Sequence, residues 1–169
     1  MMNPPENFNE MKYPLFVTWL KKGELRGCIG TFAEDEPFGI TLMRYSLIAA
    51  VQDTRFPPIT EDELSSLRVE ISLLNSFEKI NDPLDWHVGT HGIEIEFKNP
   101  NSGKIHRGTF LPNVAPEQGW NQVETLEHLC AKAGYKSGTN GVISSFEPVK
   151  NHFILIRRYQ SLKFGLDYH

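Results

Sequence analysis

The sequence predicts an α+β fold in which an antiparallel sheet is flanked by helices. Strand-like runs occur in pairs separated by short turn sequences, as in β-hairpins, and helical patterns stand between the pairs. The regular strand–helix alternation of a parallel sheet is missing from the sequence. With 169 residues and 40% apolar side chains, the chain is long enough for one compact domain with a substantial core.

The first hairpin is predicted near the start of the chain. The run 13–20, YPLFVTWL, is rich in β-branched and aromatic residues, and the turn-prone KKGE separates it from the run 25–32, LRGCIGTF. We expect these two runs to pair as antiparallel strands.

The next segment changes from a strand pattern to a helix pattern. Residues 37–52 carry apolar side chains close to the helical period, and the two prolines of RFPP then stop the helix. Thr60 and Glu63 have the spacing of a capping box, which predicts a short helix to about Leu67. The alternating run 68–77, RVEISLLNSF, predicts a strand.

The second half contains another hairpin, a helix and a last strand. GIEIEF (92–97) and IHRGTFLP (105–112) are joined by the turn sequence NPNSGK. A helix is expected after its cap at Asn121, followed by the loop-like GYKSGTNGV (134–142) and the strand FILIRRY (153–159). The apolar stripe of that helix comprises Val123, Leu126, Leu129, Cys130 and Ala133.

Composition argues against several classes of protein. The net charge is −4, so the chain has no global basic field that would attract nucleic acid or acidic membranes. It has no apolar run near the ~20 residues that span a bilayer, and its start lacks the pattern of a secretory signal. Two cysteines are too few for a disulfide framework. We expect a soluble intracellular protein with reduced thiols.

Four segments resemble the AMMECR domain family: LRGCIGTF, QDTRFPP, VGTHGIEIEF and RGTFLPNVAPEQGWNQVETLEHLCAKAGY. The resemblance implies an α+β fold of two lobes with a cleft between them, in which LRGCIG lies. It also sets the expected organisation of the chain. Residues 1–12 would form a short polar N-terminal segment, 13–160 a single domain and 161–169 a C-terminal tail. Members usually carry a helix before the PLFVTW strand, so one wall of the fold is expected to be missing here or supplied differently.

The resemblance does not imply a settled activity. Eukaryotic members are suspected to act in the nucleus and cytoplasm, and we expect a cytoplasmic and/or nuclear location here. Prokaryotic members are fused to, or encoded beside, Memo-like proteins and radical SAM enzymes. That association suggests an enzyme acting on RNA or another nucleotide-containing substrate, and it makes a Memo-like protein a candidate partner; no membrane partner is implied.

The segment LRGCIGTF contains the first candidate site. Strand alternation puts Arg26, Cys28 and Gly30 on one face, where a guanidinium about 6–7 Å from the thiol would favour the reactive thiolate. Gly27 and Gly30 have no side chains, so a phosphate or substrate backbone could approach closely. The alternative is that Cys28 is a small buried residue and that the glycines let a helix pack on the sheet.

The segment NVAPEQGW (113–120) contains the second candidate site. A proline and a glycine bracket Glu117, so we expect a fixed irregular loop in which this carboxylate acts as a general acid or base, or pairs with an arginine. The alternative role is to cap the helix that starts at Asn121. Trp120 could stack on a planar ligand or belong to the core.

Arg55 is the third candidate, since the prolines after it restrict the backbone and reduce the entropy cost of holding its guanidinium for an anion. The alternative is a structural ion pair with Glu70 or Asp53. Cys130 is expected in the core. His87 and His91 lack further ligands, so we assign no metal, and no sequence motif indicates a cofactor.

Two function classes follow from these candidates. The first is a regulatory or binding module whose LRGCIG cleft recognises a nucleotide, nucleic acid or protein through Arg26, Gly27, Gly30, Arg55 and Trp120. The second is a cysteine-dependent enzyme in which Cys28 is the nucleophile and Glu117 moves a proton.

Overall fold

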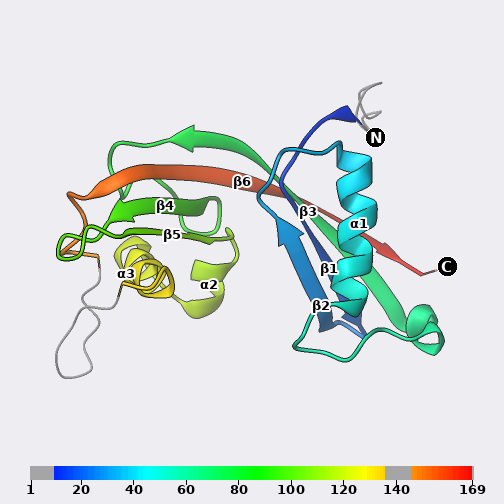
Figure 1. Cartoon of the computed structure of the whole chain (residues 1–169). Helices are drawn as coiled ribbons and strands as arrows, with labels where there is room; N and C mark the ends of the chain where they lie inside the picture. The colour runs from blue at the N-terminus through cyan, green and yellow to red at the C-terminus, as the bar shows by residue number, and fades with distance from the viewer. Residues whose placement is uncertain (1–9, 136–145, 169) are drawn as a thin grey trace. The chain divides into compact units, whose positions relative to one another are not determined.

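The computed structural model describes residues 10–135 and 146–168 and has the predicted α+β architecture (Figure 1). Six strands form one antiparallel sheet in the order β2-β1-β3-β6-β4-β5. Most of the predicted loop 134–142 lies outside the described residues. The strands are β1 (Leu15–Lys21), β2 (Glu24–Thr31), β3 (Leu67–Lys79), β4 (Gly92–Lys98), β5 (Ile105–Phe110) and β6 (Phe153–Asp167). The helices are α1 (Phe38–Val51), the 3₁₀ helix η2 (Glu61–Ser66), α2 (Val114–Gln118) and α3 (Gln122–Lys132).

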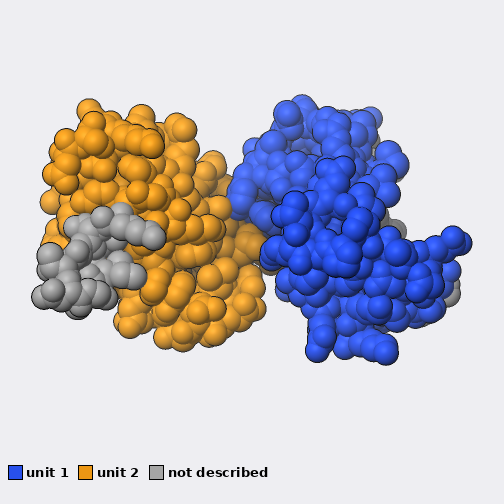
Figure 2. Space-filling view, turned by 60° about the horizontal axis from the view of Figure 1, so that its bottom comes forward, with its two compact units in different colours: residues 1–75, 162–169 blue, residues 76–161 orange. Residues whose placement is uncertain are grey.

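The chain divides into two compact units, coloured separately in Figure 2. The first unit comprises residues 1–75 with 162–169, and the second comprises residues 76–161. The long strands β3 and β6 contribute to both units. Strand β6 continues to Asp167 and so includes most of the segment that we expected to be a C-terminal tail.

The first unit is built from the predicted hairpin and the predicted helix. Strands β1 and β2 pair with Thr18 opposite Cys28, and β1 also pairs with β3. Leu15 and Val17 are fully buried on the sheet face that packs against α1. Apolar alternation along β1 therefore fixes which face receives the helix.

Two short features of the first unit follow from local sequence. Thr60 and Glu63 form the predicted capping box, and the turns that follow are a 3₁₀ helix. Helix α1 starts directly after Pro37 and ends before the aspartate and arginine of QDTR. The segment between these two helices is the part of the chain that approaches the free edge of β2.

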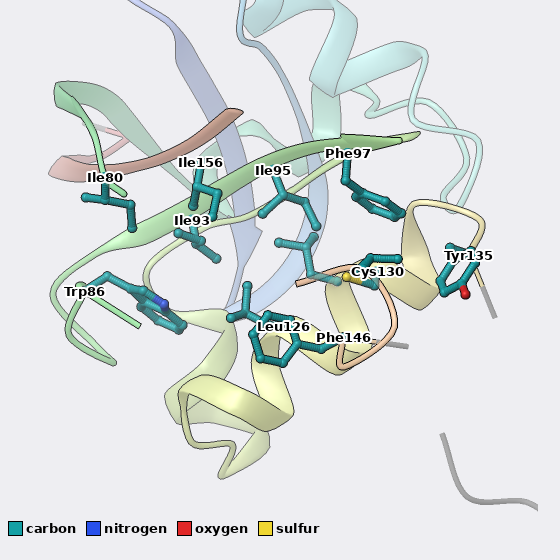
Figure 3. Close-up of a cluster of buried hydrophobic side chains, with 12 residues drawn as sticks. Ile80, Trp86, Ile93, Ile95, Phe97, Leu126, Cys130, Tyr135, Phe146 and Ile156 are labelled. Atoms are coloured by element: carbon teal, nitrogen blue, oxygen red, sulfur yellow. The ribbon is translucent and has the colours of Figure 1, made fainter. Parts of the chain in front are cut away.

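The core of the second unit lies where β4, β5 and β6 meet α3 (Figure 3). The Asn121 side chain and Glu124 form the capping box that starts α3. Val123, expected on the apolar stripe of this helix, is 43% exposed. The buried residues of α3 are Thr125, Leu126, Leu129 and Cys130, so Val123 lies at the margin of the buried face.

Among the residues that the structure describes, no helix has both the length and the apolar character needed to cross a bilayer.

Candidate functional site

The free edge of β2 is closed by two side chains that follow α1. The main-chain N–H of Cys28 donates to Asp53 Oδ2 at 2.9 Å, and Arg55 Nη2 donates to the carbonyl oxygen of Cys28 at 3.1 Å. Strand β2 stands first in the sheet order, so these main-chain groups have no neighbouring strand on that side. Asp53 and Arg55 thus satisfy the outward main-chain N–H and C=O of Cys28, which would otherwise be open to pairing with another strand.

Asp53 and Arg55 also form a two-pronged ion pair. Arg55 Nε donates to Oδ1 at 2.9 Å and Nη2 to Oδ2 at 2.7 Å, while the Arg55 main-chain N–H donates to Oδ1 at 3.1 Å. The hydrogen bonds from Arg55 hold the pKa of the Asp53 carboxyl well below its usual range, although burial opposes this shift. The same bonds raise the pKa of Arg55. Of the two ion-pair partners considered for Arg55, the structure has Asp53.

The pair differs strongly in exposure. The Asp53 side chain is 6% exposed, whereas that of Arg55 is 56% exposed. Within the described part of the chain, Nη1 of Arg55 makes no hydrogen bond. The guanidinium is therefore held in place along one side and open to solvent on the other.

The Cys28 thiol is partly buried and has a hydroxyl beside it. Thr18 Oγ1 donates to Cys28 Sγ at 3.1 Å across the hairpin. No histidine or carboxylate of the described residues forms a hydrogen bond with this sulfur. The thiol thus has a polar neighbour but no adjacent base of the kind that activates a nucleophile.

The guanidinium of Arg26 is bound by other groups of the first unit. Its Nε and Nη2 donate to Glu63 at 3.1 and 2.9 Å, and Nη1 donates to the carbonyl oxygen of Pro57 at 2.7 Å. Lys21 also donates to Glu63, at 2.7 Å. Bonds from Arg26 and Lys21 hold the pKa of the Glu63 carboxyl well below its usual range. Arg26 thus fastens the proline segment and η2 to β2, with 12% of its side chain exposed.

The two glycines beside Cys28 are closely packed by other parts of the first unit. A β-carbon on Gly27 would overlap the carbonyl oxygen of Ala49 in α1, and one on Gly30 would overlap the ring of Phe16. Gly27 therefore lets α1 approach the sheet, as the packing alternative expected. The space beside Gly30 holds an aromatic ring from the neighbouring strand.

Glu117 and Trp120 belong to the second unit, whereas Cys28 belongs to the first. The expectation of an irregular loop was wrong, because residues 114–118 form helix α2. Pro116 is tolerated in the first turn, where its missing N–H has no helical partner, and Gly119 ends the helix with φ 71°. The Asn113 side chain donates to Glu117 at 2.9 Å.

Trp120 already has a planar neighbour. Its ring stacks on His128 with centroids 3.9 Å apart and an interplanar angle of 9°. One face of the indole is therefore occupied by a side chain of α3.

The remaining candidates are structural. Cys130 is fully buried, and burial raises the pKa of its thiol to about 12. His91 is buried and accepts the main-chain N–H of His87 at 2.9 Å on Nδ1. The described residues contain no group of three or more histidine, cysteine or acidic side chains that could hold a metal ion.

Sequence reasoning missed the roles of Thr18 and Glu63. The register of the first hairpin would have identified Thr18 as the partner of Cys28 once the turn was fixed. Glu63 was recognised only as a helix cap, and no local pattern reveals its bond to Arg26, which is 37 residues away in sequence.

Comparisons with a family model, with curated proteins and with solved structures each found a match that covers nearly the whole chain. The AMMECR1 family model matches residues 2–164. An uncharacterized protein of Arabidopsis thaliana is 43% identical over 98% of this chain and 76% of its own length. An uncharacterized protein of Saccharomyces cerevisiae is 40% identical over 96% of this chain and 71% of its own length. The crystal structure of an uncharacterized protein from Pyrococcus horikoshii aligns with a TM-score of 0.72 at 27% identity, covering 99% of this chain and 81% of that one.

Proposed function

The chain belongs to the AMMECR1 family, and from this premise we propose that it is a binding module whose ligand is a nucleotide held by its phosphate at Arg55. One observation carries the proposal. The Arg55 guanidinium is 56% exposed yet fixed by Asp53 and by the carbonyl oxygen of Cys28. A fixed guanidinium loses little conformational freedom when it binds an oxyanion, and its Nη1 has two N–H donors to offer.

The surroundings of Cys28 give more support to binding than to the alternative of a cysteine-dependent enzyme. A nucleophilic cysteine needs a neighbouring base or a positive charge that favours the thiolate. The carboxylate of Asp53 is saturated with donors and its pKa is strongly lowered, so it is a weak base. Arg26 is engaged by Glu63 and Pro57. The other guanidinium near Cys28, that of Arg55, interacts electrostatically with Cys28, but its charge is paired with the carboxylate of Asp53.

A titration with a fluorescent ATP analogue tests the proposal, with adenosine as a competitor that lacks phosphate. We expect Arg55→Gln to weaken binding by about tenfold or more, the equivalent of one charge-assisted contact. Arg44→Gln is the matched control, because Arg44 is also half exposed and bound to a carboxylate, that of Glu36. Equal binding by the two variants, or equal competition by adenosine and ATP, would refute the proposal.

A further inference from the structure

Helix α1 presents an apolar stripe to solvent. Its members recur at helical spacing, so they share one face. The only charged residue of α1 is Arg44, and Glu36 binds it at 2.6 Å. The stripe consists of Ile40, Met43, Leu47 and Val51, which are 47%, 65%, 64% and 46% exposed.

An apolar groove of the first unit runs beside this stripe. One part, of about 280 Å³, is lined by Ala50 of α1 and Leu64 of η2. A second part, of about 270 Å³, is lined by Leu166 at the end of β6. Trp19 and Leu64 line both parts, so the two adjoin. Leu64 and Leu166 are themselves 38% and 67% exposed. We call this depression, together with the stripe, the α1 groove.

Exposed apolar surface of this extent is typical of a site that another chain covers. The stripe extends over 12 residues of helix, from Ile40 to Val51, which is about 18 Å at the usual rise, or about three turns. A second helix lying along α1 would match that length and could insert its own apolar ridge between α1 and η2.

The acidic side chains at the two ends of α1 favour a basic partner in the groove over a second copy of this chain. The helix η2 contributes Glu61, Asp62 and Glu63, of which Glu61 and Asp62 are exposed and Glu61 lines the groove. Three acids, residues 34–36, precede the other end of α1. Antiparallel pairing of two copies through α1 would bring these two acidic ends together, which is unfavourable. A partner with basic side chains would complement both ends.

We propose that the α1 groove binds an amphipathic helix of another protein, with lysine or arginine on both sides of its apolar ridge. None of the groove-lining residues belongs to the Arg55 site, so this proposal does not depend on the nucleotide proposal. The groove adds a protein-docking surface to the first unit.

Synthetic peptides test this proposal directly. The first probe has leucines at helical spacing flanked by lysines, the second has the same ridge flanked by glutamates, and the third has the lysine composition scrambled. Trp19 is an internal reporter because it lines the groove, whereas Trp86 and Trp120 belong to the second unit. Fluorine NMR of protein labelled with 5-fluorotryptophan resolves which indole responds.

We expect the lysine peptide to bind saturably, to shift the Trp19 resonance, and to bind more weakly at high salt. Leu47→Ser should weaken binding by about tenfold, and Ile154→Ser, which alters a 48% exposed residue of the second unit, should not. Both variants change exposed side chains, so thermal melts should confirm that both fold. Equal weakening by the two variants, an unchanged Trp19 resonance, or a dimer in sedimentation that Leu47→Ser dissociates would overturn the proposal.

Discussion

Asp53 and Cys28 are joined by a hydrogen bond of 2.9 Å between the carboxylate and the main-chain N–H, so a residue just after α1 satisfies an outward main-chain group at the free edge of β2. The same carboxylate holds Arg55, the side chain on which the nucleotide proposal rests. Asp53 thus couples the stability of the strand edge to the position of the guanidinium.

Asp53→Asn should destabilise the protein because the amide would place N–H groups against Arg55 and leave a buried donor unsatisfied. We expect the free energy of unfolding to fall by about 1–3 kcal/mol, measured by urea titration at pH 7. Glu36→Gln is the control, since Glu36 pairs with the exposed Arg44 and should change stability by less than about 0.5 kcal/mol. Similar losses in the two variants would mean that Asp53 has no special role.

Stability should also fall in acid. The pKa values of Asp53 and Glu63 are lowered by folding, so both groups stabilise the native state above their unfolded pKa values near 4, and this contribution is lost as the pH falls. Urea midpoints measured from about pH 6 to pH 3 should decrease. The double variant Asp53→Asn/Glu63→Gln should show a shallower decrease, whereas a parallel curve would contradict the assignment.

Arg26→Ala should lower the melting temperature by roughly 4 °C or more, because it releases Glu63 and two carbonyl oxygens together. Arg44→Ala removes an arginine that is 52% exposed and should leave the melting temperature nearly unchanged. Scanning calorimetry of both variants makes the comparison. If Arg26→Ala melts like the wild type, Arg26 is free to serve a ligand instead.

The sequence was sufficient to predict most of the fold, but not which groups the charged side chains bind. Hairpins, caps and apolar alternation are local signals, and the two capping boxes at Thr60 and Asn121 are present as predicted. Glu63, which binds Arg26, and Asp53, which binds the main chain of Cys28, are 37 and 25 residues away from these partners in sequence, and periodicity contains no information on such contacts. The short helix α2 was missed because a proline and a glycine so close together are as typical of a loop as of a short helix.

Gly27→Ala should be strongly destabilising. The added β-carbon would overlap the carbonyl oxygen of Ala49, a backbone atom that cannot rotate away, so we expect a loss of about 3 kcal/mol in urea unfolding, at the upper end for overpacking. Gly23→Ala is the comparison, because Gly23 has open space and only its φ of 84° opposes a side chain. That backbone cost is about 1–2 kcal/mol. A smaller loss for Gly27→Ala than for Gly23→Ala would show that α1 does not pack closely on Gly27.

The two thiols should react at very different rates in the folded protein. Burial raises the pKa of Cys130 from 9.0 to about 12, which reduces its thiolate at neutral pH by roughly a thousandfold. Cys28 is partly exposed. A titration with a chromogenic disulfide should therefore count one thiol in the native state and two after unfolding, and Cys28→Ser should remove the native reaction.

The rate of that native reaction also separates the two function classes. A binding module requires no activation of Cys28, and we expect its rate to be at most that of a free thiol such as glutathione, because Thr18 and the strand restrict access to the sulfur. A cysteine-dependent enzyme requires a rate well above that of the free thiol at neutral pH, since its thiolate must be favoured. A rate ten times that of glutathione, abolished by Cys28→Ser, would therefore replace the binding proposal with the enzymatic one.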